Sequence, residues 1–331
     1  MKRALLFGSA ILAVIALNTG CATSKTTQQT DSWDTSYGGA DKSFDTGLLE
    51  LRAQIAPKFK AFEFHDTVTG RTLAYNLFIP EDYDENLNYP LVLFLHDASC
   101  VGKGVEAPLM QGYGAIIWAT DESQSENPSF VLAPAYAGPD PVTNDDWQVS
   151  GELDMTLRML DYVTGQYSID ETRLYITGQS MGCMMAFYIN ANHPDLFAAS
   201  MYVAGQWDAS VLAPLANMKF FYIISEADPK ASVGMGSLRS ILEKSGAVIG
   251  EAKFSARLPD AEQEKYVLDL IHKGHSINFV RFNKGTVVPA TFNPGKPDFF
   301  VEHMYSFDCA YKLSSARTWL FEQSKEFYTT E

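Results

Sequence analysis

The sequence predicts an α/β protein whose central sheet is mostly parallel. Short, continuous apolar runs recur along the chain and are typical of strands buried on both faces. Stretches between these runs repeat apolar residues at helical spacing. Alternating strands and helices require right-handed crossovers, which place ligands outside the carboxyl ends of the strands. The expected strands are 91–95, 130–133, 174–177, 200–204, 220–224 and 277–282, and the expected helices include 152–167, 183–191, 236–244 and 315–327.

A β-hairpin is expected ahead of these strands. Residues 62–65 and 73–79 alternate apolar and polar side chains on either side of Thr69-Gly70, which is a turn sequence. Because the strands of a hairpin are antiparallel, this pair is expected to form an antiparallel edge at the N-terminal side of the sheet. The helices are expected to cover both faces of that sheet.

The N-terminal region is expected to stay outside the folded part of the chain. Lys2 and Arg3 precede an apolar stretch and then Cys21, an arrangement that resembles a bacterial lipoprotein signal. The resemblance implies a signal peptide over 1–20, a lipid on Cys21 and an outer-membrane location in the cell envelope. A conventionally exported periplasmic or secreted protein is the alternative. Residues 21–45 are polar and predict a flexible tether, which leaves 46–331 as a single domain.

Charge and cysteine content restrict the partners and the compartment. The chain of 331 residues has a formal net charge of -15, and it lacks the clustered Lys and Arg that phosphate binding needs, so no nucleic-acid partner is expected. Cys100, Cys183 and Cys309 remain after Cys21, an odd number for an oxidising compartment. Either Cys183 pairs with Cys309, or all three behave as buried thiols.

Residues 178–182 read Gly-Gln-Ser-Met-Gly, which is a Gly-x-Ser-x-Gly motif. The motif lies between an expected strand and an expected helix. In such a turn only small residues fit beside a serine that is lifted above the sheet. The motif therefore predicts that Ser180 is a nucleophile, and the alternative is an incidental serine in a tight glycine turn.

A serine nucleophile needs a histidine to accept its proton and a carboxylate to orient that histidine. The motif resembles the serine elbow of α/β-hydrolases, and this resemblance implies the chain order serine, acid, histidine, each after a strand. Asp228 follows the next suitable strand and is the expected acid, with Glu226 as the alternative. His303 follows the last strand, where the final helix is expected to begin, and is the expected base. His275 precedes that strand and is the alternative base.

Two backbone amides are expected to stabilise the oxyanion of the tetrahedral intermediate, at about 3 kcal/mol each. Met181 provides the first because it directly follows the nucleophile. The second is expected from the loop His96-Asp97-Ala98, which resembles the His-Gly-x-x loop of esterases with Asp97 in place of glycine. Ala98 is therefore the expected second donor, and His96 is expected to support the loop by hydrogen bonding.

The segments 93–97, 178–182, 226–229 and 302–304 together resemble the α/β-hydrolase serine esterases related to feruloyl esterases and polyhydroxybutyrate depolymerases. More distantly, they resemble the catalytic domain of prolyl oligopeptidases. The resemblance implies an α/β-hydrolase catalytic domain over 46–331 that cleaves carboxylic esters without a cofactor or metal. A serine peptidase of the prolyl oligopeptidase type and a non-catalytic binding lipoprotein are the alternatives.

The substrate pocket is expected to have aromatic walls. Trp147 and Trp207 each lie beyond an expected strand, on the side of the sheet where ligands bind. With Gln179, the neighbour of the nucleophile, they are the expected substrate contacts. The expected substrate is a small-molecule or polymer-linked ester.

Overall fold

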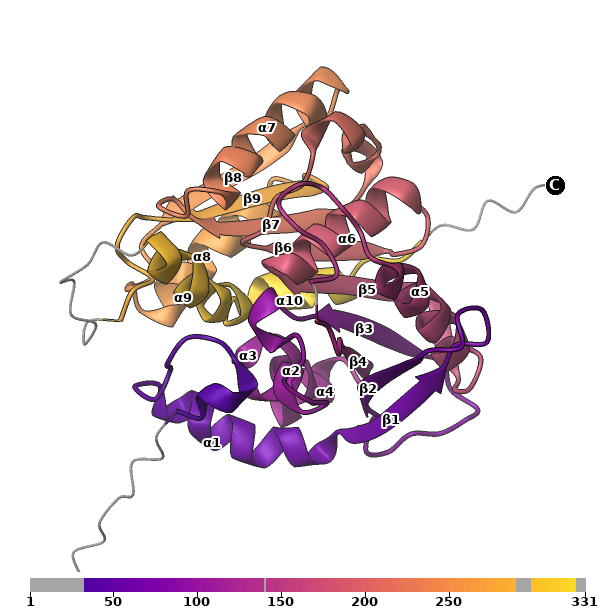
Figure 1. Cartoon of the computed structure of the whole chain (residues 1–331). Helices are drawn as coiled ribbons and strands as arrows, with labels where there is room; N and C mark the ends of the chain where they lie inside the picture. The colour runs from indigo at the N-terminus through magenta and orange to yellow at the C-terminus, as the bar shows by residue number, and fades with distance from the viewer. Residues whose placement is uncertain (1–32, 140, 290–298, 326–331) are drawn as a thin grey trace, which may run out of the picture. The chain divides into compact units, whose positions relative to one another are not determined.

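A nine-stranded sheet forms the centre of the computed structural model, which describes residues 33–139, 141–289 and 299–325 (Figure 1). The strand order is β1-β2-β4-β3-β5-β6-β7-β9-β8. Strand β2 pairs antiparallel with β1 and β4, and the remaining neighbours are parallel, which confirms the predicted mixed sheet. The strands are β1 Lys60–His65, β2 Thr72–Phe78, β3 Tyr89–Leu95, β4 Phe130–Ala135, β5 Ile169–Gln179, β6 Ala199–Val203, β7 Phe220–Ser225, β8 Ile249–Phe254 and β9 Ile277–Phe282.

Helices cover both faces of this sheet because its central strands are apolar on both sides. In β3, Leu91, Leu93 and Leu95 join the core under helices α5, α6 and α7. The alternate residues Val92 and Phe94 join the core under α1, α2, α3, α8, α9 and α10. The helices are α1 Thr46–Ile55, α2 Ala107–Met110, α3 Tyr113–Ile116, α4 Asp121–Glu126, α5 Gly151–Thr164, α6 Met181–Asn192, α7 Ala231–Lys244, α8 Asp260–Ile271, α9 Phe299–Tyr311 and α10 Ser314–Phe321.

The predicted hairpin is confirmed as β1 and β2. Its turn closes with a hydrogen bond of 2.8 Å from the Asp66 amide to the Arg71 carbonyl oxygen. Gly70 occupies the left-handed region with φ 69° and meets no neighbouring atoms, so the turn requires glycine for its backbone conformation alone.

Strand β8 was not predicted from the sequence. It lies at the edge of the sheet, beside β9, and only part of it is buried. Its central Glu251 forms ion pairs with Arg239 and Arg281. An edge strand of this kind needs no continuous apolar run, so the pattern that identified the buried strands does not apply to it.

The boundary between the last two described helices differs from the prediction. His303 lies in the second turn of α9, and a separate helix, α10, follows it. Leu313 separates the two helices with an extended conformation of φ -68° and ψ 92°. No glycine or proline marks this break in the sequence, and the expectation that His303 begins the final helix rests on its position after the last expected strand.

The segment 33–45 packs on the domain, so the predicted tether is wrong for this part of 21–45. Trp33 is 6% exposed, and the guanidinium of Arg52 lies 4.8 Å from its ring centroid. Lys42 is fully buried and pairs with Asp308, with 2.8 Å between Nζ and Oδ2. A polar composition indicated too little apolar area to order the segment. One buried tryptophan and one buried ion pair nevertheless fix it to the rest of the chain.

Residues 1–32, which include the predicted signal peptide, the rest of the predicted tether and Cys21, lie outside the described residues. Within the described ranges, no helix has the length and apolar character needed to cross a membrane.

The cysteines of the domain are free thiols, so the expected alternative of a disulfide between Cys183 and Cys309 is wrong. Cys100 and Cys183 are buried, and burial raises the pKa of both thiols well above the usual range. Cys309 is partly buried on the residue scale, and desolvation of its thiol by burial raises its pKa to about 12. A thiol with a raised pKa forms little thiolate at neutral pH and is correspondingly unreactive.

Replacing Trp33 with alanine tests whether the segment 33–45 is part of the folded unit. We expect Trp33→Ala to lower the free energy of unfolding by about 3 kcal/mol, because a large buried ring leaves a cavity. Phe44→Ala is the control, since Phe44 lies in the same segment but is 46% exposed. Urea denaturation followed by circular dichroism measures both variants. Equal, small effects would mean that the segment contributes nothing to the fold.

Candidate active site

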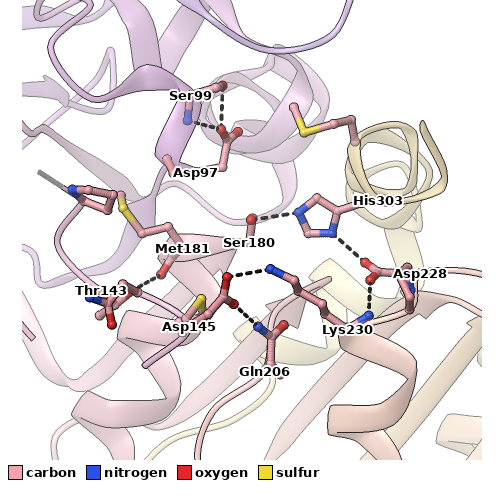
Figure 2. A pocket seen from close by; sticks show the side chains of 16 residues that line it. Asp97, Ser99, Thr143, Asp145, Ser180, Met181, Gln206, Asp228, Lys230 and His303 are labelled. Atoms are coloured by element: carbon pink, nitrogen blue, oxygen red, sulfur yellow. Dashed lines mark hydrogen bonds and ion pairs between the residues drawn. The ribbon is translucent and has the colours of Figure 1, made fainter. Parts of the chain in front are cut away.

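The turn between β5 and α6 holds Ser180 in a conformation that few residues adopt. Ser180 has φ 51° and ψ -115°, and its amide donates a hydrogen bond of 3.0 Å to the Val203 carbonyl oxygen of β6. A non-glycine residue in such a conformation costs about 1–3 kcal/mol, which the surrounding structure must offset. The turn directs the Ser180 hydroxyl into a cavity at the carboxyl ends of the strands (Figure 2).

The glycines of the Gly-x-Ser-x-Gly motif are required by close backbone contacts. A Cβ atom on Gly182 would lie 1.9 Å from the Leu95 carbonyl oxygen at the end of β3. A Cβ atom on Gly178 would lie 2.4 Å from the carbonyl carbon of Gly182, on the opposite side of the serine. Gly205, after β6, is equally restricted, because its Cβ would lie 2.7 Å from the Ser180 carbonyl oxygen. Side chains at these positions would push the elbow away from the sheet.

The structure brings the side chains of Ser180, His303 and Asp228 together, although they come from three separate loops and helices (Figure 2). His303 Nε2 lies 2.8 Å from Ser180 Oγ, and His303 Nδ1 lies 2.5 Å from Asp228 Oδ2. With a proton on Nδ1, the imidazole donates to the carboxylate, and the unprotonated Nε2 can accept the serine proton. This geometry is suited to proton transfer from the serine hydroxyl to the imidazole.

Backbone amides hold the Asp228 carboxylate in position. Asp228 is 1% exposed, and its Oδ1 atom accepts hydrogen bonds of 3.0 Å from the amides of Lys230 and Ala231. The second oxygen, Oδ2, faces His303. A buried carboxylate is costly unless its oxygens are hydrogen bonded, so these three donors are what allow the charge to remain buried.

The alternative acid and base lie away from Ser180. Glu226 is 39% exposed and binds Lys253 at 2.6 Å, and this pairing lowers the pKa of the Glu226 carboxyl. His275 precedes β9, and its ring lies beside Gly250 in β8, at the amino ends of these strands. Neither residue lines the cavity that contains Ser180.

The expected oxyanion donors, Ala98 and Met181, border the same cavity as Ser180. Met181 begins α6, and Ala98 begins a short 3₁₀ turn, Ala98–Cys100, directly beyond β3. Among the described residues, neither backbone amide donates a hydrogen bond to another protein group. Both amides are therefore available to a negatively charged oxygen in the cavity.

His96 and Asp97 support the loop that carries Ala98. His96 is buried, donates from Nδ1 to the Asp97 carbonyl oxygen at 2.7 Å and accepts from the Tyr136 amide at 3.3 Å. Burial lowers the pKa of the imidazole, which keeps it neutral as this pattern requires. The predicted supporting role of His96 is confirmed. Asp97 caps the 3₁₀ turn through the Ser99 amide at 2.8 Å, a role that glycine cannot fill.

Gln179 does not line the cavity, in contrast to the expected substrate contact. It is 2% exposed, and its side-chain amide donates to Asp97 Oδ2 and Gln111 Oε1, both at 2.9 Å. Gln179 is the last residue of β5, and its side chain points beneath the Ala98 loop. Gln179 therefore connects the elbow to that loop.

The predicted aromatic walls are also absent from this cavity. Trp147 and Trp207 pack against each other edge to face, with their ring centroids 5.5 Å apart, and neither lines the cavity. Trp207 is buried and also contacts Tyr188 of α6, whereas Trp147 is 41% exposed. The position of a residue after a strand identified the correct side of the sheet, but it did not determine the direction of the side chain.

The cavity has a volume of about 350 Å³ and combines apolar and polar walls. Methionines and prolines supply most of the apolar wall, and charged side chains, Asp145 and Lys230 among them, also line the cavity (Figure 2). The lining beyond Ser180, His303 and Asp228 consists of Asp97, Ala98, Ser99, Pro141, Thr143, Asn144, Asp145, Met181, Met184, Gln206, Pro229, Lys230 and Met304.

Three polar residues of this lining were not identified from the sequence. Asp145 binds Lys230 Nζ at 2.5 Å and accepts a hydrogen bond of 2.9 Å from the Gln206 side chain (Figure 2). Gln206 follows β6, and Lys230 shares the loop of Asp228, so their positions after strands were available as a signal. Asp145 lies in the long loop between β4 and α5, two residues before Trp147, so it also follows an expected strand. Within the described part of the chain, no group of His, Cys, Asp and Glu residues is arranged to hold a metal ion.

The arrangement of sheet, elbow and helices is that of the α/β-hydrolase class. The chain superimposes on a solved thermostable esterase with a TM-score of 0.66 and 26% sequence identity, covering 82% of this chain and 64% of that protein. Residues 67–235, just over half of the chain, match the family model Esterase, described as "Putative esterase". The chain belongs to this esterase family. The fold class and the family resemblance predicted from the sequence are therefore confirmed.

Curated relatives agree with this assignment over part of their length. "Putative esterase NocK" of Nocardia uniformis subsp. tsuyamanensis is 31% identical over 180 residues, which cover 49% of this chain and 47% of NocK. Acetylxylan esterase A of Emericella nidulans is 35% identical over 75 residues, which cover 20% of this chain and 25% of that enzyme. The chain thus spans about half the length of NocK and a quarter of the acetylxylan esterase.

Replacing Gly182 with alanine tests the close packing of the elbow. We expect Gly182→Ala to lower the free energy of unfolding by about 2 kcal/mol, because its Cβ would overlap the Leu95 carbonyl oxygen. Gly236→Ala is the matched control, since Gly236 also lies in a helix but meets open space, so alanine should slightly stabilise α7. Thermal unfolding measures both variants. A stable Gly182→Ala protein would show that the elbow is not tightly packed.

Proposed function

We propose that the protein is an exported serine hydrolase that cleaves carboxylic esters through an acyl-enzyme intermediate. The observation that carries this proposal is the continuous hydrogen-bond chain from Asp228 through His303 to Ser180. Membership in the esterase family supports ester bonds as the substrate class. No cofactor is needed, because the three side chains and two backbone amides supply a nucleophile, a base and an oxyanion site.

In the proposed mechanism, Ser180 Oγ attacks the ester carbonyl carbon while His303 Nε2 accepts the hydroxyl proton. The amides of Ala98 and Met181 donate to the developing oxyanion, each contributing about 3 kcal/mol to transition-state stabilisation. Protonated His303 then gives its proton to the departing alcohol, and the acyl group remains on Ser180. Water then attacks the acyl carbon while His303 accepts a proton from it. The bond between the acyl carbon and Ser180 Oγ breaks, His303 returns the proton to Oγ, and the acid is released.

Asp228 has two roles in this mechanism. It holds the Nδ1 proton of His303, which keeps Nε2 directed towards Ser180, and it stabilises the imidazolium that forms after proton transfer. The two backbone amides on Oδ1 prevent the carboxylate from rotating away. The acid is therefore fixed before substrate binds.

The cavity supports a modest acyl or alcohol group as the bound part of the ester. Its volume of about 350 Å³ is at the lower end of the range for small-molecule sites. Met181, Met184 and Met304 offer an adaptable apolar surface, and Asp145, Lys230 and Gln206 can hydrogen bond to a polar substituent. The cavity is partly open to solvent, so the remainder of a polymer-linked ester can extend out of it.

Export and lipid attachment form the second part of the proposal. The charged start, the apolar stretch and Cys21 support a lipoprotein signal over 1–20, with attachment to the outer membrane through Cys21. A periplasmic or secreted form without lipid is the alternative. Metabolic labelling with a radioactive fatty acid, compared between the wild-type chain and Cys21→Ser, separates the two.

Hydrolysis of p-nitrophenyl acetate by purified protein tests the nucleophile. We expect Ser180→Ala to lower kcat by at least about 10³-fold, because the attacking atom is removed. Ser210→Ala is the control, since Ser210 is an exposed serine that does not line the cavity. Equal rates for wild type and Ser180→Ala would reject the proposal. Peptide cleavage without ester cleavage would favour a peptidase, and absence of fluorophosphonate labelling would favour a non-catalytic binding protein.

The pair Asp228→Asn and Glu226→Gln tests the identity of the acid. We expect Asp228→Asn to lower kcat by about 10⁴-fold, because the amide no longer stabilises the proton on His303 Nδ1. Glu226→Gln removes the exposed ion pair with Lys253 and leaves an amide oxygen that can still accept from the Lys284 amide, so kcat should stay near the wild-type value. Steady-state kinetics on the same ester measures both. The reverse pattern would assign the acid to Glu226.

A further inference from the structure

The N-terminal strap, residues 33–45, connects two parts of the site that come from distant parts of the chain. Through Gly39 it contacts the loop that carries Ala98, and through Asp41 and Lys42 it contacts α9, the helix that carries His303. The proposed mechanism uses none of these residues. Their contacts nevertheless include Ser99, the residue next to the expected oxyanion donor Ala98.

A buried ion pair fixes the strap to α9. Lys42 is fully buried, and Asp308 Oδ2 lies 2.8 Å from its Nζ. The second oxygen of Asp308 accepts a hydrogen bond of 3.1 Å from the Tyr113 amide of α3. Nearby, the Tyr305 hydroxyl donates to the Asp41 carbonyl oxygen at 2.8 Å. Breaking a buried pair leaves an uncompensated charge, so the strap is held firmly at this end.

Two glycines bring the strap against the Ala98 loop. The Gly39 amide donates a hydrogen bond of 2.7 Å to Ser99 Oγ. Gly38 has φ 78°, and a Cβ atom there would lie only 2.2 Å from the Ser99 carbonyl oxygen. Only a residue without a side chain permits both the backbone conformation and this approach. The contact at Ser99 is therefore specific to the glycine pair.

Ser99 connects the strap to the loop that carries Ala98. Its hydroxyl accepts from Gly39 and from Gln111 Nε2, both at 2.7 Å, and donates to Asp97 Oδ1 at 2.6 Å. The loop residues on both sides of Ala98 are thus joined to each other and to the strap. Ala98 lies between them, and the direction of its amide depends on how they are held.

We propose that the N-terminal strap is a positioning element of the oxyanion hole, acting on Ala98 through Gly38, Gly39 and Ser99. The proposal rests on the proposed esterase function and adds to it strap residues that do not line the cavity, together with Ser99, which lines the cavity and connects the strap to Ala98. An oxyanion donor contributes only when it is aimed at the position of the charged oxygen. A displacement of about 1 Å at a site of this kind costs up to about 10²-fold in rate.

The test compares Gly38→Ala with Gly70→Ala. Both glycines have positive φ, at 78° and 69°, so alanine introduces similar backbone strain at each position. Only the Gly38 side chain would collide with Ser99, because a Cβ at Gly70 meets nothing within 4 Å. We expect kcat for p-nitrophenyl acetate to fall about tenfold in Gly38→Ala, with KM within twofold of wild type, and to be unchanged in Gly70→Ala.

Ser99→Ala is a second variant, which keeps the strap backbone intact and removes only the connecting hydroxyl. We expect a similar fall in kcat and a slower reaction of Ser180 with a fluorophosphonate, since that reaction also develops charge on an oxygen. The pH profile of kcat should keep the wild-type midpoint in both variants, because the strap contact at Ser99 does not touch His303. Circular dichroism verifies that each variant is folded.

The outcomes separate this proposal from the proposed function. If wild-type protein neither hydrolyses the ester nor reacts with the fluorophosphonate, the proposed function is rejected, and the positioning role is rejected as well. If wild type is active but Gly38→Ala and Ser99→Ala keep its kcat, the strap proposal alone is overturned. A loss of activity that comes only from a higher KM also overturns the strap proposal. So does a fall in kcat that is accompanied by a shifted pH midpoint.

Discussion

The contact between Gly182 and the Leu95 carbonyl oxygen determines the geometry around Ser180. It presses the first turn of α6 against the end of β3, where a Cβ atom would lie only 1.9 Å from that oxygen. The elbow with Ser180 and the loop with Ala98 therefore begin from two backbone segments in direct contact. The distance between the proposed nucleophile and the proposed oxyanion donors is set by backbone packing, which is more rigid than side-chain packing.

The histidine reaches this elbow from the opposite layer of helices. Helix α9 packs on the face of the sheet away from α6, and the hydrogen bond from His303 to Asp228 fixes the imidazole relative to β7. A buried carboxylate without donors would cost several kcal/mol, so this hydrogen bond contributes to the fold as well as to the site. The same helix carries Asp308, which pairs with Lys42 of the N-terminal strap. One helix thus couples the proposed base to the N-terminal segment.

Much of the site could be located from local patterns. The buried strands were recognised by their apolar runs, and Ser180, Asp228 and His303 were chosen because each follows a strand in the required order. The structure brings these side chains within hydrogen-bond distance. The prediction of the pocket-lining residues was wrong, because Trp147 packs on Trp207 and Gln179 points beneath the Ala98 loop. Position after a strand identifies the side of a sheet and leaves the direction of a long side chain undetermined.

The sequence by itself determined the α/β class, the antiparallel edge and the elbow, because strand burial and glycine spacing are properties of neighbouring residues. Only the tertiary structure decided that 33–45 is packed, that Asp145 meets Lys230 and that Cys183 and Cys309 stay unpaired. These outcomes depend on contacts between residues far apart in the chain. The energies of these contacts come from burial and charge pairing. Composition does not predict these energies, because the fold determines which residues become partners.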